Sequence, residues 1–180
     1  MLITKQSWVR ILLFNLFIVA FLGFLMRYKI SFEFPLLNQK NVQHAHSHFA
    51  FGGWVTQTLF FLLVNYLNKN KTGINFFKRY NKLLLLNLIC AYGMLISFVI
   101  YGYNFISIIF STSSIFVSFF FTMYYFRDLK TLNTNEIVSN WFKAALVYNV
   151  ISSFGTFYLA YMMASKNFNQ DLYLSSIYYY

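Results

Sequence analysis

The chain has 180 residues, of which 59% are hydrophobic, 23% are aromatic and only 10% are charged, and its formal net charge is +10. A soluble domain carries roughly 25% charged residues and a disordered chain is poor in aromatic residues, so this composition excludes both classes. The single cysteine, Cys90, excludes a disulfide framework and a metal site built from several thiolates.

Long apolar runs separated by short basic segments predict a multi-pass membrane protein. A bilayer core of about 30 Å requires about 20 apolar residues in a helix, and five runs meet that length. We therefore expect an all-α fold, a single transmembrane helical domain over residues 1–180, with spans at 8–26, 42–67, 83–103, 106–126 and 141–163. A sixth apolar stretch, 172–180, is too short to cross, so we expect an incomplete sixth span and the N-terminal part of a longer protein.

The basic residues between the apolar runs predict the orientation of the helices. Nine lie on one side of the predicted bundle and four on the other, which puts the N-terminus in the cytoplasm by the positive-inside rule. We expect a cell (inner) membrane protein whose first partner is the lipid bilayer, and no nucleic acid, because no basic stripe is interleaved with aromatic residues. The nine are Lys5, Arg10, Lys69, Lys71, Lys78, Arg79, Lys82, Arg127 and Lys130; the four are Arg27, Lys29, Lys40 and Lys166.

Few polar side chains lie inside the predicted spans. The single amides Asn15 and Asn87 predict hydrogen bonds between helices, as do the serines that recur at helical spacing from Ser107 to Ser118. The alternative interpretation is that these serines, which share one helix face, line a pathway for a substrate. No Asp or Glu lies within any predicted span, which argues against a proton- or cation-coupled transporter.

All three histidines of the chain, His44, His46 and His48, fall within five residues near the predicted outer end of the second span. If the helix has already begun there, His44 and His48 share one face and His46 points away from it; if the segment is extended, all three point one way. Neutral imidazole is the commonest metal ligand of proteins and the usual axial ligand of haem. Gly52 and Gly53 follow, and would let either a flat macrocycle or a neighbouring helix lie against the backbone.

A histidine shortly before the run Phe49-Ala50-Phe51-Gly52-Gly53 resembles subunit I of the haem–copper oxidase and nitric oxide reductase superfamily. The likeness covers roughly residues 8–67, and the distance from histidine to run differs from the family's by about a residue. It implies that one of the three histidines, preferably His44 or His46, is an axial ligand of haem b, and that any enzymatic role is part of an oxidoreductase.

The chain departs from that family after the second span, because no histidine follows His48. It therefore lacks a second haem histidine and the copper ligands, so we assign no catalytic residue and expect no complete oxidase. A six-coordinate haem would need a methionine, such as Met94, Met123 or Met162, or a ligand from further helices of the same protein or another membrane subunit.

Three interpretations therefore stay open. The first is a haem-binding, electron-transfer membrane protein. The second is a Cu or Zn site at the outer membrane face, with nitrogen ligands from His44, His46 and His48. The third is a non-catalytic helical membrane protein, an assembly subunit or a transporter fragment, in which the histidines are interfacial.

Overall fold

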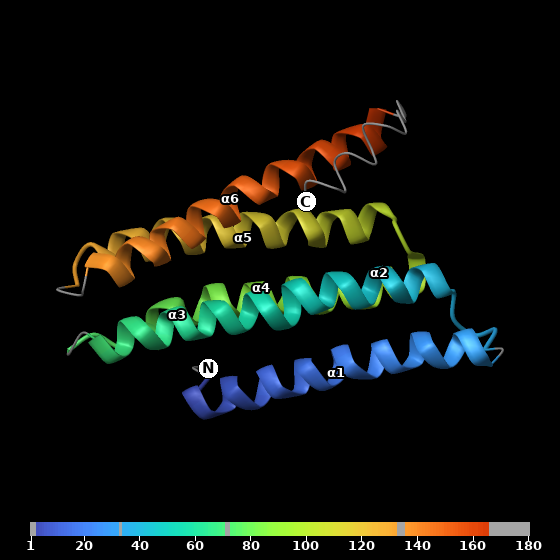
Figure 1. The fold of residues 1–180 in the computed structure, drawn as a ribbon, viewed down its shortest axis with the longest axis horizontal. Helices are drawn as coiled ribbons and strands as arrows, with labels where there is room; N and C mark the ends of the chain where they lie inside the picture. Colours follow the sequence, from blue (N-terminus) through green and yellow to red (C-terminus); the bar gives the residue numbers. More distant parts are fainter. Residues whose placement is uncertain (1–2, 33, 71–72, 133–135, 166–180) are drawn as a thin grey trace. The chain divides into compact units, whose positions relative to one another are not determined.

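The computed structural model describes residues 3–32, 34–70, 73–132 and 136–165, and for 159, 160 and 162–165 it describes the backbone alone. Within these ranges the chain is helical and contains no strand, which confirms the predicted all-α fold class. The elements in chain order are α1 (Lys5–Ser31), α2 (Gln39–Phe49), η1 (Ala50–Thr56), α3 (Gln57–Asn70), α4 (Phe76–Tyr101), α5 (Phe105–Leu129) and α6 (Glu136–Ser165) (Figure 1).

Four helices are long and apolar enough to cross a membrane. They are Lys5–Ser31, Gln39–Asn70, Phe76–Tyr101 and Phe105–Leu129, and they match the first four predicted spans. The predicted fifth span, 141–163, lies within α6, and the predicted incomplete span 172–180 lies outside the described residues. The coarse prediction of a helical membrane protein is thus supported, and the number of crossings beyond four stays a prediction.

The chain forms two compact units, Met1–Asp128 and Leu129–Tyr180. In the first unit α2 contacts both α1 and α4, and α3 contacts α4, so the second crossing lies between the first and the third. In the second unit α6 carries Ser152 and Ser153, whose hydroxyls donate to the carbonyl of Asn149 at 2.9 and 3.0 Å. All three histidines lie in the first unit, on α2.

Asn38 determines where α2 begins. Its side-chain oxygen accepts from the backbone N–H of Lys40 at 2.9 Å, the capping interaction that satisfies an unpaired donor of a first helical turn. The helix that starts at Gln39 is therefore already formed at the first histidine. Of the two conformations left open by the sequence, the extended one is wrong and the helical one is confirmed.

A π-helical segment, η1, interrupts the second crossing at Ala50–Thr56. The wide turn is held by amides from two neighbouring helices. Asn15 of α1 donates to the carbonyl of Gly53 at 2.5 Å, and Asn87 of α4 donates to the carbonyl of Gly52 at 3.0 Å. In lipid, backbone carbonyls of an irregular helix need donors from such neighbours. The predicted role of Asn15 and Asn87 as interhelix contacts is confirmed.

Candidate functional site

The three histidines point to two sides of α2. A rotation of about 100° per residue puts His44 and His48 on one face and His46 nearly opposite. The first two contact Phe98 and Tyr103, and His46 contacts α1. Among the described residues no group of three or more His, Cys, Asp or Glu side chains is placed to hold a metal ion. A single ion bound by all three imidazoles is not an arrangement that this helix provides.

His44 and His48 are packed into an aromatic cluster at the end of α4. The His48 ring lies parallel to Phe98, with centroids 4.4 Å apart and an interplanar angle of 12°. Its Nε2 shares a hydrogen bond of 3.2 Å with the Tyr103 hydroxyl. The His44 ring meets Tyr103 edge-on at 4.5 Å. Stacked and edge-to-face contacts of this kind orient both imidazoles, and the hydrogen bond satisfies one nitrogen of His48.

His46 lies against α1 with an unsatisfied nitrogen. Its Nδ1 is buried and has no hydrogen-bond partner. A Cβ atom built on Gly23 of α1 would lie 3.4 Å from His46 Cε1, so the absence of a side chain at Gly23 allows this close approach. A buried imidazole nitrogen without a partner costs free energy, and such a group in a native structure is commonly explained by a bound ion, water or ligand.

A groove of about 660 Å³ runs between α1 and α2 and includes His46. That volume lies within the range of about 300–1,000 Å³ found for small-molecule and cofactor sites. From Val19 to Ile30 the groove follows α1 for about 16 Å at 1.5 Å per residue. Arg27, Gln39 and Gln43 lie towards the connection between the two helices, together with the apolar Ile30, whereas Val19 and Ala20 lie at the other end. The lining residues are Val19, Ala20, Gly23, Met26, Arg27, Ile30, Gln39, Gln43 and His46.

Gly52 and Gly53 do not line this groove. A Cβ on Gly53 would lie 2.7 Å from the Phe49 ring, and one on Gly52 would lie 3.0 Å from Met94 Cε. Phe49 and Met94 belong to the buried core cluster that α2 and α4 share. Of the two roles considered for these glycines, close packing of neighbouring side chains is therefore the one that the observed contacts support.

Two of the methionines considered as second haem ligands, Met94 and Met123, do not line the groove either. Met94 is 3% exposed within the core cluster, and Met123 is 45% exposed on α5. The side chain of Met162 lies outside the described residues. The groove instead contains Met26 and Arg27, which the sequence did not single out. Both follow Gly23 at helical spacing, but the sequence does not show that this face of α1 meets α2.

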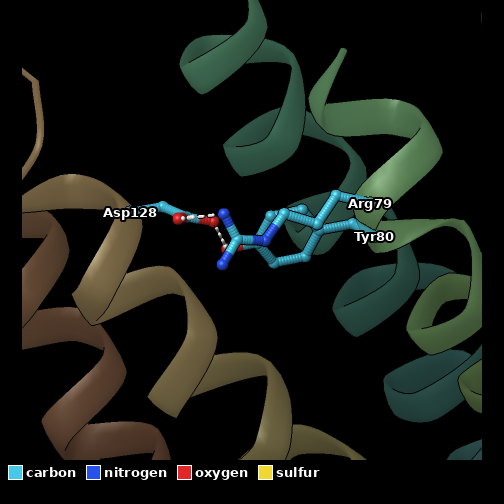
Figure 2. Close-up of polar contacts among 3 residues, drawn as sticks. All are labelled: Arg79, Tyr80 and Asp128. Atoms are coloured by element: carbon cyan, nitrogen blue, oxygen red, sulfur yellow. Dashed lines mark hydrogen bonds and ion pairs between the residues drawn. The ribbon is translucent and has the colours of Figure 1, made fainter. Parts of the chain in front are cut away.

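A second polar cluster lies near the start of α4 and the end of α5 (Figure 2). The carboxylate of Asp128 accepts from the Tyr80 hydroxyl at 2.7 Å and pairs with Arg79 Nη1 at 2.7 Å. Asp128 and Tyr80 are buried, whereas Arg79 is half exposed. The Tyr80 hydroxyl, the Asp128 carboxylate and the Arg79 guanidinium are thus bonded to one another. We interpret this cluster as a connection between α4 and α5 and not as a binding site.

The chain was compared with protein-family models, curated proteins and solved structures, and none of them matches it.

Proposed function

We propose that the chain is an integral membrane protein that binds haem b through His46 in the groove between α1 and α2 and takes part in electron transfer. The observation that carries this proposal is that His46 lines a groove of about 660 Å³ between α1 and α2. His44 and His48 are weaker candidates, because Phe98 and Tyr103 already hold both rings. Of the two histidines preferred from the sequence as the axial haem ligand, His44 and His46, we therefore propose His46.

The residues of the groove fit a flat, apolar group with acidic substituents. Val19, Ala20 and Ile30 supply apolar wall. Arg27, with Gln39 and Gln43, supplies donors at one end, and a guanidinium binds carboxylates with two parallel hydrogen bonds. Haem bound there would supply one-electron redox chemistry. The chain's part is to offer the imidazole, exclude water along the apolar wall and hold the carboxylates.

In this proposal the protein lies in the cell (inner) membrane with its N-terminus in the cytoplasm. It crosses the membrane five times, and a sixth span begins after the fifth. His46 and Arg27 then lie towards the outer face, where long basic side chains reach the interface. The resemblance to oxidase subunit I supports the role as one portion of a larger oxidoreductase, completed by further helices of the same protein or of another membrane subunit.

The test is a dithionite-reduced minus air-oxidised visible spectrum of the detergent-purified chain, expressed with added haem precursor, with a pyridine haemochrome assay for haem content. The variants are His46→Ala and, as a matched control, His48→Ala. We expect haem in the wild type and the control and loss of most of it in His46→Ala. Equal haem in both variants, or none in the wild type, would refute the proposal.

The shared face of His44 and His48 favours one second candidate, a Cu or Zn site at the outer membrane face. Two imidazoles four residues apart on a helix, whose rings both contact Tyr103, present nitrogen ligands of the kind that these metals accept. Metal content after growth in defined medium tests it, because a His44→Ala/His48→Ala double variant should lose Cu or Zn while keeping haem.

A further inference from the structure

One face of α4 is exposed and is basic only near the start of the helix. At about 100° per residue, five exposed side chains fall within about 60° of one another on this face. We call them the α4 stripe: Lys78, Lys82, Leu85, Ile89 and Ile96. We infer that the α4 stripe binds one anionic phospholipid, with the phosphate between the two ammonium groups and an acyl chain along the three apolar side chains. The binding involves neither haem nor the groove between α1 and α2, and so goes beyond the proposed function.

The two lysines of the α4 stripe have no counter-charge in the part of the chain that the structure describes. Their ammonium groups take part in no ion pair and no hydrogen bond there. Arg79, which lies between them in sequence, pairs instead with Asp128 at 2.7 Å. Residues four apart on a helix have Cβ atoms about 5–6 Å apart, so the positive charges of Lys78 and Lys82 repel each other. An anion between them relieves that repulsion, and lysine binds phosphate as a point charge.

The start of α4 adds to the positive potential around these lysines. A helix N-terminus carries about half a positive charge, which acidic residues in the first turn commonly offset. The first turn of α4 contains no acidic residue, and the capping side chain, that of Asn75, is neutral. No residue of α4 itself therefore balances the charge at this end. An anionic headgroup is the complementary partner, because basic residues close to a membrane surface attract anionic lipids.

The apolar part of the α4 stripe favours a lipid over a free phosphate ion. Leu85, Ile89 and Ile96 are all exposed, and they follow Lys82 on the same face. At 1.5 Å per residue, Lys82 and Ile96 are separated by about 21 Å along the helix axis, which exceeds half of a hydrocarbon core of about 30 Å. An acyl chain whose headgroup is held at the lysines can therefore lie beside apolar side chains through one leaflet.

The test uses the full chain, purified in a neutral detergent and titrated with phosphatidylglycerol or with phosphatidylcholine of the same acyl chains. Native mass spectrometry counts the bound lipids and gives the dissociation constant of the first. The variants are Lys78→Gln/Lys82→Gln and, as a matched control, Lys5→Gln/Arg10→Gln. The control removes the same charge from two exposed residues of α1, which lie about 140° apart around the helix and so do not share a face.

We expect the wild type and the control to bind phosphatidylglycerol equally and in preference to phosphatidylcholine. The Lys78→Gln/Lys82→Gln variant should bind phosphatidylglycerol about 30-fold more weakly, and each single variant about fivefold, because one lysine near an anionic surface contributes about that factor. Glycerophosphoglycerol, the headgroup without acyl chains, should not displace the lipid at equal concentration. The haem content of every variant should equal that of the wild type, so the proposed function is tested separately.

Three results would overturn the assignment of a lipid to the α4 stripe. The first is a wild type without preference for phosphatidylglycerol. The second is an equal loss of affinity in the two double variants, since net charge alone would then explain the binding. The third is displacement by glycerophosphoglycerol, which would indicate an anion site without the apolar residues. If the lysine double variant fails to fold, unchanged affinity in Lys78→Gln and in Lys82→Gln has the same meaning.

Discussion

Replacement of Asn15 by leucine tests what holds the π-helical segment in the membrane. Asn15 is fully buried; its amide nitrogen donates to the Gly53 carbonyl at 2.5 Å, and its oxygen accepts from the Tyr92 hydroxyl at 2.8 Å. Leucine has the same branched shape and number of side-chain heavy atoms but makes neither bond, so the carbonyl and the hydroxyl each lose a partner. Interhelical hydrogen bonds in membranes contribute about 0.6 kcal/mol on average and at most about 1.7, so two of them predict a loss of about 1–3 kcal/mol.

The assay is equilibrium unfolding in mixed detergent micelles, followed by far-UV circular dichroism. A double-mutant cycle with Tyr92→Phe isolates the Asn15–Tyr92 bond and should give a coupling free energy of about 0.6 kcal/mol. The control is Leu13→Ala, since Leu13 is 62% exposed on the same helix and should change the free energy of unfolding by less than about 0.5 kcal/mol. An Asn15→Leu variant as stable as wild type, or a strictly additive cycle, would refute the reasoning.

Two further substitutions test other contacts of the first unit. Gly93→Ala should destabilise by about 1–3 kcal/mol through overpacking, because the new Cβ would overlap the Phe110 ring; a neutral result in the same unfolding assay would show that the ring moves aside at no cost. Asp128→Ala should cost about 1–3 kcal/mol, since the buried Tyr80 hydroxyl loses its acceptor. Thermal denaturation in detergent checks that loss, and adding Tyr80→Phe should recover part of it; no recovery would contradict this account.

The sequence predicted the helices well because the length of an apolar run is a local property. Four runs long enough to cross the bilayer became four long apolar helices. The separation of His46 from His44 and His48 was also predictable once the segment was taken as helical, because it depends only on the rotation per residue. The capping of α2 by Asn38, seen in its bond to Lys40, chooses between the two conformations that the sequence left open.

The groove between α1 and α2 was not predictable, because it depends on how two helices pack and is not a local property of the sequence. Its residues come from two helices, and no pattern within either helix shows which face of α1 meets which face of α2. Gly23 marks the contact only when His46 is seen beside it. The histidine cluster therefore indicated α2 alone, whereas Met26 and Arg27, which complete the groove, lie on α1.

The π-helical segment connects these observations. Gln57 follows His46 by eleven residues, which is about three turns of an α-helix. If the helix were uninterrupted, Gln57 would therefore lie on the same face as His46, towards α1. Instead, Gln57 Nε2 donates to the Leu84 carbonyl of α4 at 3.0 Å, and its oxygen accepts from Asn87 at 2.6 Å. Because a π-helical turn takes more residues than an α-helical one, η1 changes the direction in which the following side chains point, which accounts for the change of face. The buried amide thereby reaches polar partners on α4, while the turns before η1 keep His46 against Gly23 of α1.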